Sequence, residues 1–114
     1  MHEYALTEQI IAICEEYAAK NSAKSVTVIN LVVGESSGYV AESIKLYFDI
    51  IAKNSVCENA TVLIESIKPM LKCTSCGGLF ERKPFSFTCT FCGGDGDSTE
   101  IGREFYIKSI EIEA

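Results

Sequence analysis

Two cysteine pairs, Cys73-Thr74-Ser75-Cys76-Gly77-Gly78 and Cys89-Thr90-Phe91-Cys92-Gly93-Gly94, decide how the second half of this 114-residue chain folds. Each Cys-x-x-Cys predicts a tight turn that directs two sulfurs towards one point, and we expect the following glycines to let backbone N–H groups turn towards the sulfurs. Two such turns predict a tetrahedral site of four thiolates, in which Zn²⁺ has no open position and is structural. Two disulfides, a redox site and an iron–sulfur centre stay open as alternatives.

The composition indicates a globular chain with one main domain and a small satellite, since 47% of the residues are hydrophobic. No apolar run is long enough to span a membrane. The N-terminus has no basic segment followed by an apolar one, so we expect no signal peptide and a cytoplasmic, reducing location. Paired cysteines in such a setting indicate a metal more often than a disulfide. The net charge of −6 disfavours nucleic acid as a partner.

Hydrophobic periodicity predicts helices and strands on both sides of the cysteines. The expected order is a helix at 7–21, a strand at 26–33, a helix at 39–54, a strand at 61–67 and, after the cysteine-rich segment, a strand at 104–112. Ser36 or Ser37 is expected to cap the second helix.

This order predicts an α+β fold, a three-stranded sheet with two helices on one face. Residues 1–69 and 100–114 would form the α/β domain that carries the N-terminus. Residues 70–99 would form a small zinc-ribbon-like domain inserted between the last two strands, projecting from the hairpin that joins them.

The only histidine and the two cysteines outside the pairs are interpreted from their positions in the sequence. His2, the only histidine, stands beside the terminal amine and Glu3, and such a nitrogen-rich set suits square-planar Ni²⁺ or Cu²⁺. Spacing alone favours the simpler reading of a histidine without a role. Cys14 lies on the apolar face of the first helix and is expected in the core. Cys57 follows the second helix in a polar connection, where we expect an exposed thiol without an assigned function.

The chain resembles the HypA family, the nickel metallochaperones of hydrogenase maturation, some of which also serve urease. The resemblance covers the whole chain and is carried by Met1-His2-Glu3, Val33-Gly34-Glu35, Tyr47-Phe48, both cysteine pairs and Ile110-Glu111-Ile112. It implies that His2 binds Ni²⁺ with backbone nitrogens nearby and Glu3 in support. It also implies that four residues bind Zn²⁺: Cys73, Cys76, Cys89 and Cys92.

The same resemblance implies partners: a nickel-handling GTPase and the hydrogenase large subunit. It implies a carrier rather than an enzyme, since no bond of a substrate is made or broken. Gly77 and Gly93 stand where some members have histidine, so exchange of zinc ligands through histidine is not expected. The client, hydrogenase or urease, stays open, and so does a homodimer formed through an edge strand.

The sequence has features of two other classes of function. A zinc-ribbon module for nucleic acid or protein is favoured by basic residues among aromatic ones around the cysteines, namely Lys68, Lys72, Arg82 and Lys83 with Phe80, Phe85, Phe87 and Phe91. We expect these phenylalanines instead to form the small core of the cysteine-rich segment. An enzyme is disfavoured because the chain has no second histidine, no glycine-rich phosphate loop and no open zinc position. Glu35 and Glu42 are expected to be solvated acids.

Overall fold

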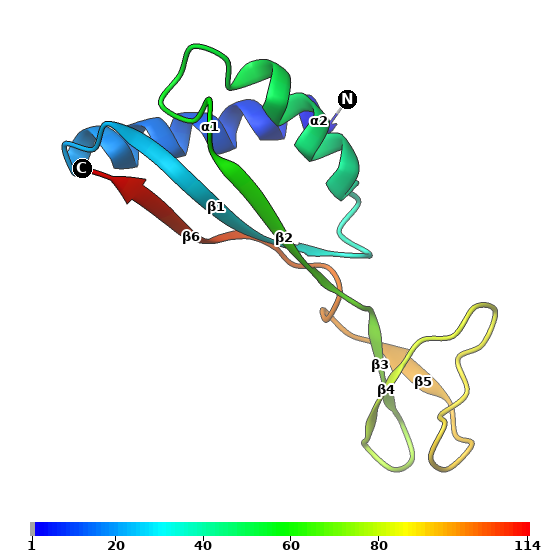
Figure 1. Cartoon of the computed structure of the whole chain (residues 1–114). Coiled ribbons are helices and arrows are strands. Elements are labelled where there is room, and N and C mark those ends of the chain that lie inside the picture. Colours follow the sequence, from blue (N-terminus) through cyan, green and yellow to red (C-terminus); the bar gives the residue numbers. More distant parts are fainter. Residues whose placement is uncertain (1) are drawn as a thin grey trace.

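The computed structural model describes the backbone of residues 2–114 and the side chains of residues 3–114. The molecule is elongated, 54 × 27 × 16 Å, and has two lobes (Figure 1). The large lobe holds α1 (His2–Lys20), β1 (Ser25–Gly34), α2 (Ala41–Ile51), β2 (Thr61–Ile67) and β6 (Phe105–Glu113). The segment between β2 and β6, called the insert below, holds β3 (Met70–Cys73), β4 (Leu79–Glu81) and β5 (Gly96–Ser98).

The sheet of the large lobe has the order β2-β1-β6. β1 pairs with β2 in parallel and with β6 antiparallel, so the α+β fold with a three-stranded sheet is confirmed. The expected hairpin between the last two strands is wrong. Because α2 carries the chain across between β1 and β2, these two strands run parallel and become neighbours. β2 and β6 are therefore the two edges of the sheet, and the insert joins these edges.

Both helices cover the same face of this sheet, as the sequence predicts (Figure 1). The central strand contributes Ile29 and Leu31, each at most 1% exposed, and α2 contributes Ile44 and Phe48. Burying a side chain of this size stabilises the fold by about 1.5–3 kcal/mol. Cys14 is fully buried in the same core, which confirms its expected place.

Cys57 is also fully buried, so the expectation of an exposed thiol is wrong. The connection after α2 is tied to β1, because the Val26 N–H donates to the Val56 carbonyl at 2.9 Å. The Cys57 N–H donates to the Ser55 hydroxyl at 3.0 Å. These two bonds turn the Cys57 side chain into the core, where its hydrogen bond with Cys14 raises the pKa of the Cys14 thiol, and burial raises it further.

The two helices begin differently from the prediction. α1 starts at His2, five residues before the predicted Thr7. α2 follows Val40, and no side chain of its own segment caps it, so the expected serine cap is wrong. The N–H of Val40 donates instead to a carboxylate oxygen of Glu3 at 3.1 Å. The start of α2 is therefore capped by a residue that is distant in sequence, and not by the nearby serine that the sequence predicts.

The insert projects from a tight crossing of backbone at the end of the large sheet. A side-chain carbon on Gly34 would lie 2.1 Å from the carbonyl oxygen of Gly102. Gly102 has a φ of +100°, and a side chain there would lie 2.6 Å from the Cα of Pro69. Only glycine fits these two contacts. The outgoing and returning chains are therefore held together where the two lobes meet.

No helix within residues 2–114 is long and apolar enough to cross a membrane.

Candidate metal centre

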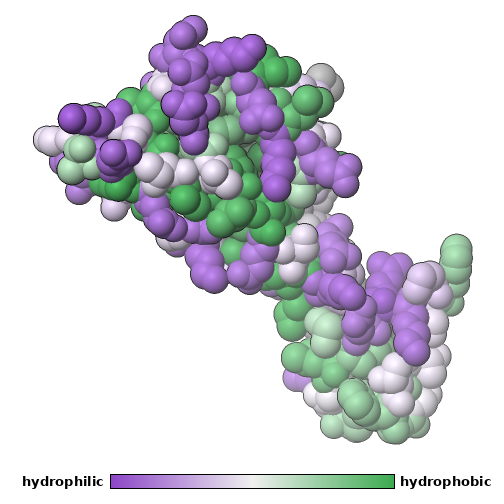
Figure 2. Space-filling view, in the orientation of Figure 1, coloured by the Kyte–Doolittle hydropathy of each residue, from purple (hydrophilic) through white to green (hydrophobic). Residues whose placement is uncertain are grey.

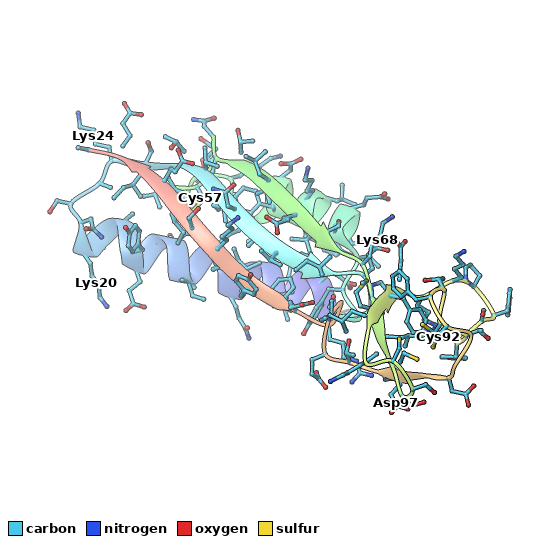
Figure 3. The ribbon with its side chains drawn as sticks, turned by 90° about the horizontal axis from the view of Figure 1, so that it is seen from below. Lys20, Lys24, Cys57, Lys68, Cys92 and Asp97 are labelled. Atoms are coloured by element: carbon cyan, nitrogen blue, oxygen red, sulfur yellow. The ribbon has the colours of Figure 1, made fainter. Side chains whose placement is uncertain are left out.

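The two predicted turns bring their four sulfurs together inside the insert, near the labelled Cys92 in Figure 3. The Sγ atoms all lie within 4.8 Å of one another. Cys73 and Cys92 are 3.4 Å apart, and Cys76 and Cys89 are 3.8 Å apart. A tetrahedron with Zn–S bonds of about 2.3 Å places its sulfurs about 3.8 Å apart. The donor set and its spacing therefore fit a structural zinc ion, whereas a disulfide needs about 2.05 Å.

Each turn is closed by its first glycine. The N–H of Gly77 donates to the Cys73 carbonyl, and the N–H of Gly93 to the Cys89 carbonyl, both at 3.0 Å. Both glycines have positive φ, +74° and +80°, a conformation that L side chains rarely adopt. The N–H groups of these two glycines bind carbonyl oxygens, while other backbone N–H groups of the turns face the sulfurs, as the sequence predicts.

Residues within the turns supply N–H groups to the sulfurs. Cys76 and Ser75 each donate to the Cys73 sulfur at 3.4 Å, and Phe91 donates to the Cys89 sulfur at 3.3 Å. The Cys76 and Ser75 N–H groups lower the pKa of the Cys73 thiol to about 6, against the effect of burial. The turn therefore favours the thiolate, the form in which cysteine binds a metal.

The same crowding of sulfurs opposes ionisation of the last thiol. The Gly94 N–H lowers the pKa of Cys92, but the neighbouring Cys73 and Cys76 sulfurs outweigh it and raise that pKa to about 12. Four thiolates in contact need a compensating cation. A divalent soft metal supplies that charge, so the electrostatics of the site agree with its geometry.

The insert has a small core of its own, formed by Leu71, Cys73, Phe80 and Cys89. Phe80 is 3% exposed and confirms the expected aromatic core at one position. The other three phenylalanines contradict it, since Phe85 is fully exposed, Phe91 is 73% exposed and Phe87 is 50% exposed. Two of the four core members are cysteines, so sulfur occupies the interior space that these rings were expected to fill. Figure 2 shows apolar residues on the surface of the smaller lobe.

The start of α1 lies on the large lobe, at a distance from the insert (Figure 1). Tyr4 packs edge-on against Tyr47 of α2, with ring centroids 5.3 Å apart, and the Glu3 carboxylate binds the N–H of Val40. The first turn of α1 is thereby fixed against the start of α2. Met1 and the side chain of His2 fall outside the described residues, so the structure places only Glu3 of the predicted nickel residues.

Three comparisons place these features among known proteins. A family model described as hydrogenase/urease nickel incorporation, metallochaperone, hypA matches residues 1–112. The hydrogenase maturation factor HypA of Caldanaerobacter subterraneus is 43% identical over 114 residues, covering 99% of this chain and 100% of that protein. The solution structure of the Ni metallochaperone HypA from Helicobacter pylori has a TM-score of 0.65 and 29% identity, covering 98% of this chain and 97% of its own.

A second solved structure agrees with the first. The solution structure of a HypA protein has a TM-score of 0.70 and 30% identity, covering 98% of this chain and 96% of that one. The match extends over both lobes, with the α/β sheet and the four-cysteine cluster in their predicted order. The chain therefore belongs to the HypA family of nickel metallochaperones for hydrogenase maturation.

Proposed function

We propose that the chain binds Ni²⁺ at its N-terminus, through the His2 imidazole and neighbouring backbone nitrogens. It then delivers the ion, with a nickel-handling GTPase, to the large subunit of [NiFe]-hydrogenase or to urease. The observation that carries the proposal is that α1 begins at His2, and that Glu3 holds this first turn against α2. The metal ligands would thus stand on a fixed platform instead of on a free tail.

A helix start suits amide coordination for two physical reasons. The first four N–H groups of a helix have no hydrogen-bond partner within the helix. Nickel can therefore bind the nitrogens of these first residues without breaking a helical hydrogen bond. A deprotonated amide also carries negative charge, which the positive end of the helix dipole stabilises. Square-planar Ni²⁺ prefers such nitrogen donors.

We further propose that residues 70–99 form a zinc-binding domain in which Cys73, Cys76, Cys89 and Cys92 hold the ion. With four protein ligands the zinc has no open position, so it holds the insert together and activates no water. The acidic chain, at −6, suits a protein that carries a cation and works through protein partners in the cytoplasm.

Nickel binding by untagged, zinc-loaded protein tests the proposal. We expect one Ni²⁺ per chain, with affinity falling steeply below about pH 6.5, because both the imidazole (pKa about 6.5) and the amine (about 7.7–8.0) bind only when deprotonated. Extra residues before Met1 convert the amine into an amide and are expected to weaken binding. Equal affinity with and without such an extension would show that the amine is not a ligand.

One observation favours a second candidate function, a zinc-ribbon module that binds nucleic acid or protein. Three phenylalanines of the insert are exposed, and the Arg82 guanidinium lies 5.0 Å from the centre of the Phe87 ring. Exposed rings beside cations are the features that bind single-stranded nucleic acid or a protein partner. Titration with DNA and RNA decides between these two uses of the surface.

A further inference from the structure

We propose that the cleft between the two lobes is a binding site for a phosphate group. The cleft has a volume of about 290 Å³. Three parts of the chain line it: Ser36 follows β1 in the large lobe, Ile101 and Arg103 lie where the insert returns to β6, and the rest of the insert supplies Pro69, Met70, Leu71, Arg82, Ser98 and Thr99. A ligand held there would contact both lobes at once.

The charge of the cleft is opposite to that of the chain. Two arginines, Arg82 and Arg103, are among its lining residues, and no aspartate or glutamate is. The whole chain carries −6, so this is a local reversal of sign. An anion is the class of ligand that such a cleft would concentrate.

The Arg82 guanidinium is held in place and has no carboxylate partner among the described residues, so it can bind an oxyanion. Its guanidinium stacks on the Phe87 ring at 5.0 Å, and among the described residues no carboxylate lies within ion-pair distance of it. A cation–π contact of this kind does not use up the guanidinium N–H groups, which can still donate to an oxyanion. The Arg82 N–H also donates to the Pro69 carbonyl at 3.4 Å, which fixes its backbone at the junction.

Arg103 has a carboxylate partner that a ligand can replace. Its Nη1 lies 3.6 Å from Glu100 Oε1, and the Glu100 side chain is 90% exposed. Exposed pairs of this kind contribute little to stability. A phosphate dianion that reaches both guanidiniums therefore competes well for Arg103. Two other acids near the junction are engaged, Glu81 with Lys68 at 3.3 Å and Glu104 with the Gly102 N–H at 2.7 Å.

The walls of the cleft are held in place before any ligand binds. The Ser36 N–H donates to the Gly102 carbonyl at 2.7 Å, and the Thr99 hydroxyl donates to the Met70 carbonyl at 2.7 Å. Ser36 and Ser98 add hydroxyl groups to the lining. Two guanidinium forks with hydroxyls beside them offer donors from several directions, which suits a tetrahedral oxyanion better than a planar carboxylate.

Titration of the zinc-loaded protein with inorganic phosphate tests the site, followed by ¹H–¹⁵N NMR at constant ionic strength set by chloride. We expect saturable shifts at millimolar phosphate for amides on both sides of the cleft, Ser36 and Arg103 on one and Arg82 and Ser98 on the other. The same titration is repeated with a nucleoside triphosphate and with acetate. A tighter response to the nucleotide would identify a phosphate ester as the source, and a response to phosphate alone would identify the free ion. An equal response to acetate would contradict a phosphate site.

Variants of the arginines and of their neighbours make the test specific. Arg82→Gln and Arg103→Gln are each expected to weaken phosphate binding about tenfold, the loss of one charge-assisted hydrogen bond. Lys83→Gln is the matched control, since Lys83 is exposed beside Arg82, carries the same charge and does not line the cleft. It is expected to bind nearly as well as the parent. Glu100→Gln removes the competing carboxylate, so it is expected to bind more tightly.

The variants also separate a failed site from a failed fold. Zinc content and NMR dispersion report whether each variant is folded, and Arg82→Lys keeps the charge but loses the planar fork if Arg82→Gln does not fold. Equal weakening by Lys83→Gln and Arg82→Gln would show diffuse attraction to positive charge and overturn the proposal. Shifts confined to one side of the cleft, or no saturation at millimolar phosphate, would also overturn it.

Discussion

The carboxylate of Glu3 accepts a hydrogen bond from the backbone N–H of Val40 at 3.1 Å, so the first turn of α1 is tied to the residue before α2. This one contact satisfies a backbone donor at the start of α2, where no local side chain does so. It also fixes the part of the chain that we propose binds nickel. Glu3 therefore has a structural role in addition to any role at the metal.

Replacement of Glu3 is expected to affect stability more clearly than nickel binding. Glu3→Ala removes the capping acceptor and is expected to lower the free energy of unfolding by about 1 kcal/mol. Glu3→Gln keeps an acceptor oxygen and is expected to lose less. Both variants retain the backbone nitrogen of residue 3, so Ni²⁺ binding is expected to weaken only modestly. Thermal unfolding and nickel titration measure the two effects; a Glu3→Ala variant as stable as the parent would remove the capping role.

Loss of the cysteine cluster is expected to unfold one lobe only. Cys73→Ala or Cys89→Ala leaves three thiols for the metal, and zinc sites contribute about 10–16 kcal/mol to the folding of small domains. The large lobe has a separate core built from its own helices and strands. We expect zinc to be lost and the NMR signals of the insert to collapse, while those of α1, α2 and the β2-β1-β6 sheet stay dispersed.

The ligand set at zinc has its own check. X-ray absorption at the zinc edge is expected to show four sulfur neighbours at about 2.3 Å. Two or more nitrogen or oxygen neighbours would contradict the all-cysteine site.

The sequence contained enough information to predict most of the fold and the cysteine cluster. The strand Thr61–Ile67 lies where predicted, because a β-branched run ended by Pro69 has few other structures open to it. Cys-x-x-Cys pairs carry their geometry within four residues, so the sulfur cluster also follows from local sequence. Both successes rest on short-range patterns.

The errors concern features that distant residues decide. The missing serine cap depends on Glu3 meeting Val40, which lies 37 residues further along the chain. The burial of Cys57 depends on a backbone bond between Val56 and Val26. The neighbours of β1 depend on the path of the whole chain through α2. None of these contacts has a signature within a local window of sequence.

The two thiols of the large core are expected to be unreactive in the folded protein. Cys14 and Cys57 are both fully buried, and their mutual hydrogen bond, with burial, raises the pKa of the Cys14 thiol. The neutral Cys14 thiol is a poor nucleophile. The same hydrogen bond lowers the pKa of the Cys57 thiol, so burial is what protects that residue from a reagent. With zinc bound, a thiol reagent is expected to modify neither residue until denaturant is added, as mass spectrometry of peptides would show. Rapid modification of Cys57 in the native protein would contradict its burial.

Nucleic acid is not expected to bind tightly despite the exposed rings. The net charge of −6 repels phosphates, and non-specific affinity of basic patches falls steeply with salt. We expect only weak binding of single-stranded DNA or RNA at low salt and none at physiological salt, measured by fluorescence anisotropy. Submicromolar affinity at physiological salt would favour the zinc-ribbon module over the carrier.

Nickel binding by His2→Ala, compared with the untagged parent, tests the central claim most directly. His2 supplies the only imidazole in the chain, and an amide releases its proton to a metal only when a primary anchor holds the ion in place. We therefore expect isothermal titration to show Ni²⁺ binding abolished in His2→Ala, while zinc content and the NMR spectrum of the large lobe stay unchanged. If His2→Ala binds Ni²⁺ as tightly as the parent, the nickel site lies elsewhere and the account of the N-terminus is wrong.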